Sequence, residues 1–138
     1  MREIKFRGID CTGQWVYGDL LQLNDGDVQI GVHGQYIDDG YHFNSSWNKC
    51  VNVNEETIGQ YTGLKDKNGK EIYEGDIILW RNQKYVVKFL SGMFYASVKE
   101  FNKGVYGGFP LWSLVEYHDE PDCGVIVGNI YEYKEEEK

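Results

Sequence analysis

The chain has 138 residues, of which 41% are hydrophobic and 15% aromatic, and its 14 basic and 22 acidic side chains leave a net charge of −8. This length suits one domain or two small halves that share a core, and the aromatic content excludes a disordered chain. The acidic balance disfavours nonspecific binding to DNA or to anionic membranes. No apolar run approaches the roughly 20 residues that cross a bilayer.

Alternation of apolar and polar residues predicts β-strands along most of the chain. We expect half-buried strands at residues 3–7, 15–23, 28–32, 84–89 and 94–99. Two runs without alternation, residues 77–80 and 125–131, predict strands that are buried on both sides, either central strands or strands between two layers. A short helix is expected after Pro110, because Leu111, Leu114 and Val115 follow helical spacing.

Turn-forming residues separate these strands. Turns are predicted at residues 24–27, 66–70, 81–83 and 90–92, and the Asn68-Gly69 pair is a strong hairpin signal. The stretch from His33 to Asn54 is interpreted as a long loop with short strands, and residues 134–138 as a frayed tail. Strands at this spacing favour a barrel or a sandwich.

The sequence contains no recognisable catalytic or metal-binding motif. Its three cysteines are widely spaced and odd in number, so we expect reduced thiols in a cytoplasm. The residues closest to a metal or hydrolase site are His118, Asp119 and Cys123, and their spacing is not that of a structural zinc site. We therefore predict a protein that is not an enzyme, with no catalytic residue, metal or cofactor.

An alternative function comes from the basic middle of the chain. Residues 65–103 carry 8 basic and 5 acidic side chains, a net charge of +3, whereas residues 1–62 carry 4 and 9, a net charge of −5. A nucleic-acid-binding module would need exposed rings beside basic groups. The candidate basic residues are Arg81, Lys84, Lys88 and Lys99, with Tyr85, Tyr95, Tyr106 and Trp112 as the candidate rings.

Four stretches resemble the YopX family of bacteriophage and prophage proteins. They are residues 4–8, residues 15–20, the long central motif at residues 58–77, and the closing motif at residues 127–132. Residues 21–57 and 81–124 match no motif of the family, and Tyr133-Lys134 stands where the family usually has Asn-Pro. The resemblance implies a mostly β fold with an SH3-like barrel, assembly into oligomers and no established activity. No site residue is carried over.

The residues and the resemblance together give one expectation. It is an all-β chain with an additional N-terminal β segment over residues 1–62, an SH3-like barrel over residues 63–138 and few short helices. The expected function is that of a noncatalytic, homo-oligomeric phage accessory or interaction protein in the host bacterial cytoplasm, with a phage or host protein as a further partner and no membrane. The alternative is a nucleic-acid-binding β-barrel module that uses residues 65–103.

Overall fold

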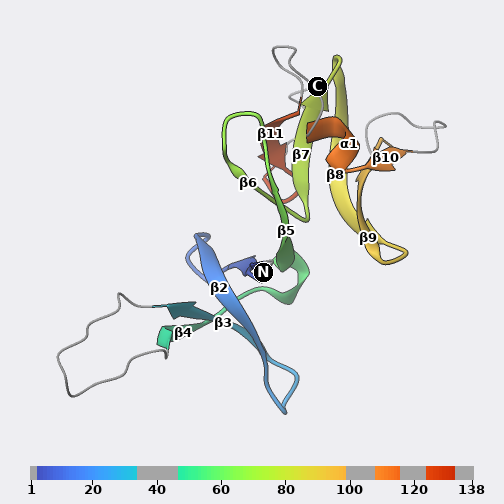
Figure 1. Cartoon of the computed structure of the whole chain (residues 1–138). Coiled ribbons are helices and arrows are strands. Elements are labelled where there is room, and N and C mark those ends of the chain that lie inside the picture. Colours follow the sequence, from blue (N-terminus) through green and yellow to red (C-terminus); the bar gives the residue numbers. More distant parts are fainter. Residues whose placement is uncertain (1–2, 34–46, 99–107, 116–123, 133–138) are drawn as a thin grey trace, which may run out of the picture. The chain divides into compact units, whose positions relative to one another are not determined.

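The structure is a computed structural model that describes residues 3–33, 47–98, 108–115 and 124–132. The chain divides into two compact units, residues 1–60 and 61–138 (Figure 1). Nearly all of the described secondary structure is β-strand, so the predicted all-β class is confirmed. Within these ranges no helix has the length and apolarity needed to cross a membrane.

The first unit is an antiparallel sheet in which β3, β2 and β1 follow the edge strand β4 in that order. Beyond β1, the sheet is continued by the first residues of β5. Its elements are β1 (Phe6–Ile9), β2 (Trp15–Gln22), β3 (Val28–His33), β4 (Trp47–Asn52), the short 3-10 helix η1 (Glu55–Thr57) and the start of β5 (Gly59–Lys65). The strands predicted at residues 15–23 and 28–32 are confirmed, as is the turn between them. The stretch interpreted as a long loop holds β4, while residues 34–46 lie outside the described part.

A buried arginine shapes the interior of the first unit. Arg7 is 5% exposed, and its guanidinium carbon lies 4.3 Å from the centre of the Trp15 ring. The charge faces the electron-rich ring face, an attraction that strengthens when water is excluded. The Thr57 hydroxyl accepts a hydrogen bond from the Ile9 amide at 2.8 Å, which fixes η1 beside β1.

The second unit contains an antiparallel sheet with the order β10-β9-β8-β7-β11, together with a β5–β6 pair. Its elements are β6 (Glu71–Tyr73), β7 (Asp76–Trp80), β8 (Gln83–Leu90), β9 (Met93–Ser97), β10 (Gly108–Pro110), α1 (Trp112–Val115) and β11 (Val125–Asn129). Leu111 and Leu114, at the predicted short helix, cover one face of the sheet. They pack on a core that includes Ile72, Ile78, Tyr85, Val87 and Ala96.

Two expectations about this sheet are wrong. The SH3-like barrel is not closed, because β10 and β11 end the sheet and do not pair with each other within the described residues. Pro110 ends β10 without an N–H to donate, and the chain then enters α1. The run at residues 125–131 forms the edge strand β11 rather than a central strand, and Val127 is 49% exposed. The other run, residues 77–80, does form an interior strand.

Tight turns join β7 to β8 and β8 to β9. In the first, Arg81 and Asn82 both have positive φ (49° and 64°), and in the second Ser91 and Gly92 do (52° and 80°). Two consecutive residues with positive φ match the right-handed twist of antiparallel strands. The strands flanking both turns are directly in register, with Trp80 opposite Gln83 and Leu90 opposite Met93.

We expect Gly92→Ala to lower the free energy of unfolding by about 1–2 kcal/mol, the cost of the left-handed conformation for an alanine. Nothing lies within 4 Å of a Cβ added there, so the loss reports backbone strain alone. Ser91→Gly is the matched control, because it relieves the same strain one residue earlier and should leave stability unchanged or raised. Urea unfolding of both variants measures this, and an unchanged Gly92→Ala midpoint would contradict it.

Candidate functional site

The central motif fixes the backbone of the second unit through one buried carboxylate. Asp66 is 7% exposed, and its Oδ1 accepts hydrogen bonds from the Asn68 and Lys70 amides at 2.9 and 2.8 Å. Its Oδ2 accepts a third bond from the Ile126 amide of β11 at 3.1 Å. The Lys67 amide also donates to the Gly124 carbonyl at 3.1 Å. Asp66 therefore closes its own turn and holds a strand that lies 60 residues further along the chain.

A second junction lies at Gly75, in the predicted turn before β7. Its amide donates to the Val87 carbonyl at 2.8 Å, and its carbonyl accepts from the Ile130 amide at 2.9 Å. Gly75 has φ +96°, and an added Cβ would come within 3.0 Å of the Tyr131 ring. Glycine alone satisfies both the conformation and the close approach. The Asp76 carboxylate closes the same turn by accepting from the Tyr73 amide at 2.8 Å.

The closing motif is held in the same way. The Asn129 side-chain oxygen accepts hydrogen bonds from the Tyr131 and Glu132 amides, both at 3.1 Å, and its amide nitrogen donates to the Glu132 carboxylate at 2.9 Å. On the backbone, Asn129 lies opposite Asp76. The polar side chains of the central and closing motifs thus bind backbone groups, and these bonds stabilise the backbone conformation.

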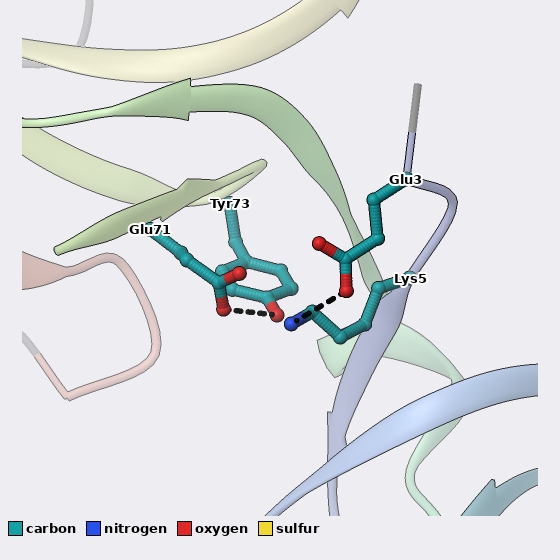
Figure 2. A network of polar contacts seen from close by, with 4 residues as sticks. All are labelled: Glu3, Lys5, Glu71 and Tyr73. Atoms are coloured by element: carbon teal, nitrogen blue, oxygen red, sulfur yellow. Dashed lines mark hydrogen bonds and ion pairs between the residues drawn. The ribbon is translucent and has the colours of Figure 1, made fainter. Parts of the chain in front are cut away.

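Two further polar contacts are drawn in Figure 2, and each lies within one unit. In the second unit the Tyr73 hydroxyl donates to Glu71 Oε1 at 3.3 Å, and in the first the Lys5 ammonium lies 3.2 Å from Glu3 Oε1. Glu3 is largely exposed, so its ion pair contributes at most about 1 kcal/mol.

The predicted basic residues do not form one surface with the predicted rings. Lys84 and Lys88 project from the same face of β8, because side chains two apart along a strand share a face. On that face Lys88 lies opposite Tyr95. Tyr85 points to the other face, where it packs in the core, and Arg81 lies in the turn before β8. Lys99 and Tyr106 lie outside the described residues.

Arg81 lies instead on an aromatic cluster. Its guanidinium carbon is 4.8 Å from the centre of the Trp80 ring. Trp80, Tyr85 and Phe109 pack edge to face, with ring centres 5.7–6.2 Å apart. Burial raises the pKa of the Tyr85 phenol above its usual value, because the phenolate would lose its water.

Catalytic and metal-binding groups are sparse in the described ranges. His33 Nε2 lies 3.0 Å from Asp19 Oδ2, with both side chains about half exposed. No group of three or more His, Cys, Asp or Glu side chains is arranged to hold a metal ion among the residues that the structure describes. His118, Asp119 and Cys123, the residues of the metal-enzyme interpretation, lie outside those residues.

In the described part of the second unit, exposed apolar side chains lie around the turn between β8 and β9. Phe89 and Leu90 are each 50% exposed and Met93 is 39% exposed. We call these three residues the hairpin end. Phe94 supports it from across the strand pair, with its ring centre 5.1 Å from that of Phe89. Sequence reasoning missed this surface, although apolar residues directly beside a turn, where polar ones are usual, could have indicated it.

These features define an all-β protein whose family-like motifs are structural and whose surface carries an apolar hairpin end. The sequence matches the YopX protein family over residues 5–135, so the chain belongs to that family. None of the curated proteins compared matches it. Among solved structures, the crystal structure of protein EF1440 from Enterococcus faecalis is similar, with a TM-score of 0.50, 22% sequence identity and 96% of each chain covered. That likeness supports the fold.

We expect Asp66→Asn to lower the free energy of unfolding by about 1–3 kcal/mol, because the Ile126 amide would face an amide N–H₂ or lose its acceptor. Asp25→Asn is the matched control. Asp25 also accepts a backbone N–H two residues on, at 2.9 Å, but on an exposed turn where water replaces the bond. Chemical unfolding of both variants measures the difference, and equal losses would contradict the role of Asp66.

The raised pKa of Tyr85 predicts a loss of stability in alkali. Below pH 10, the usual value for a tyrosine, the phenol is neutral in both states, and its contribution is fully present. Above it the unfolded chain releases the proton while the folded protein retains it, so stability falls as pH rises. Tyr85→Phe should reduce this fall, measured as the difference between the two unfolding curves from pH 8 to 11. Parallel pH dependence would contradict it.

Proposed function

We propose that this chain is a noncatalytic subunit of a homo-oligomer, a phage or prophage accessory protein that acts through protein contacts in the host bacterial cytoplasm. The observation that carries the proposal is the hairpin end, where Leu90 and Met93 lie opposite each other and Phe89 is exposed on the other face of the same hairpin. Apolar side chains gathered at one place mark contact sites between proteins. A second copy of this chain is the occupant that we propose.

The motifs of the family support a noncatalytic role. The polar side chains of these motifs are of types that can take part in catalysis, but here they accept hydrogen bonds from backbone amides. This holds for Asp66, Asp76 and Asn129. A carboxylate with its lone pairs directed at its own backbone is a poor general base, since a base must reach a substrate proton. The motif residues therefore stabilise the fold. Contacts with other proteins are then made by exposed residues outside the motifs.

The geometry favours protein contacts over nucleic-acid binding. Stacking on bases needs rings and cations on one surface. Of the rings nearest the predicted cations, Tyr85 lies in the core, and Tyr95 lies opposite Lys88 on the face that Lys84 and Lys88 share. A net charge of −8 repels phosphates from the molecule as a whole.

The proposal predicts a mass above that of the 16.0 kDa chain at micromolar concentration. We expect Leu90→Ser with Met93→Ser to lower the mass measured by light scattering after size exclusion, because these side chains lie opposite each other at the hairpin end. Leu23→Ser is the matched control, since Leu23 is 40% exposed at a turn of the first unit. A wild-type monomer would contradict the homo-oligomer, and an unchanged double variant would contradict the hairpin end as its contact.

A further inference from the structure

Strand edges in the described part of the chain differ in how far they are protected. An edge strand exposes unpaired N–H and C=O groups that pair readily with another chain. In the second unit β10 is short and ends at Pro110, which has no N–H. The outer side of β11 is covered, because its Ile126 amide donates to Asp66 and the carbonyl of Gly124, the residue before the strand, accepts from Lys67. A bulge beside Val127 also interrupts β11.

Among the described residues, the edge strand β4 of the first unit has fewer of these protections. It runs from Trp47 to Asn52, contains no proline and is hydrogen-bonded to β3 on one side (Figure 1). Its register with β3 is regular from Lys49 to Asn52 and shifts only at the start of the strand. Lys49, Cys50 and Asn52 are exposed. This is the described edge that best fits the addition of an extended segment.

We propose that β4 pairs antiparallel with β4 of a second copy of this chain, about a twofold axis that passes beside Cys50. The inference rests on the proposed function, in which the chain assembles with itself, and it names one of the interfaces. The two first units would then form one continuous sheet across the axis. Such an interface is isologous, so each residue of β4 must face a suitable residue of the same strand.

The sequence of β4 satisfies this self-complementarity in one register. In an antiparallel pair, two residues that lie opposite each other point to the same face of the sheet. A twofold axis perpendicular to the sheet keeps every residue on its own face. The residue at the axis must therefore lie opposite its own copy. An axis at Lys49 would set two ammonium groups against each other, which is destabilising. An axis at Val51 would leave only residues 50–52 of the two strands overlapped.

With the axis at Cys50, residues 48–52 of both copies overlap. Lys49 then lies opposite Val51 of the second copy, and Asn52 opposite position 48. The Asn52 side-chain oxygen already accepts from Gln29 Nε2 at 2.9 Å, which leaves its amide N–H₂ groups to donate across the interface. This register therefore combines the longest overlap with no pair of like charges.

Cysteine cross-linking tests the register directly. Residues directly opposite in an antiparallel pair have Cα atoms about 4.5 or 5.5 Å apart, within the range that a disulfide spans. Two chains are compared, one with Cys50 as its sole cysteine (Cys11→Ser with Cys123→Ser) and one with Cys11 as its sole cysteine (Cys50→Ser with Cys123→Ser). Cys11 is the matched control, because it is also an exposed free thiol of the first unit.

Copper phenanthroline with oxygen, the oxidant that takes up the two electrons and two protons of the thiol pair, is added to each chain at micromolar concentration. We expect a covalent dimer of twice 16.0 kDa from the Cys50 chain, reversed by dithiothreitol, and at least tenfold less from the Cys11 chain. Equal yields, or none from Cys50, would overturn the proposed pairing.

A second variant measures the interface without oxidation. Cys50→Lys places two like charges at the axis and should lower the mass of the assembly in light scattering, whereas Cys11→Lys should leave it unchanged. An unchanged Cys50→Lys mass would overturn the pairing. The two proposals fail differently. A wild-type monomer overturns both, whereas an oligomer with no Cys50 cross-link and no effect of Cys50→Lys overturns the β4 interface alone.

Discussion

The hydrogen bonds of the Asp66 carboxylate are the constraint on which the second unit depends. One oxygen closes the turn between β5 and β6, and the other holds the Ile126 amide of β11. Burying a carboxylate costs free energy unless its lone pairs are satisfied. Here three backbone amides satisfy it. The same contact joins the central motif to the strand that leads into the closing motif, and it covers the edge of that strand.

Local patterns predicted most of the strands. Alternation at residues 15–23, 28–32, 84–89 and 94–99 matches the positions of β2, β3, β8 and β9. Helical spacing after Pro110 likewise identified α1. These predictions succeed because they depend on neighbours within a few residues, whose side-chain directions are set by the backbone.

Long-range arrangement was harder to predict. The apolar run at residues 125–131 indicated a central strand, yet β11 lies at the edge of its sheet, with Val127 at a bulge. An apolar run indicates that a strand is buried, but it does not show that a strand lies on each side of it. Beside β11, Asp66 and the turn at Gly75 make contacts that a second neighbouring strand would otherwise make. The link from Asp66 to Ile126 spans 60 residues and leaves no periodic signal in the sequence. The candidate residues for nucleic-acid binding failed to converge for a local reason, because Lys84 and Tyr85 are consecutive in β8 and so point to opposite faces.

The motif residues and the exposed residues occupy different parts of the chain, and this separation bears on function. The turns and junctions at Asp66, Gly75 and Asn129 lie inside the family-like motifs. Both proposed contact surfaces, the hairpin end and β4, lie in residues 21–57 and 81–124, which match no motif. A scaffold whose backbone is fixed by its own polar side chains can carry different edges and loops without losing its fold. In this family the motifs would then specify how the chain folds, while the segments between them would specify which partner surface the chain contacts.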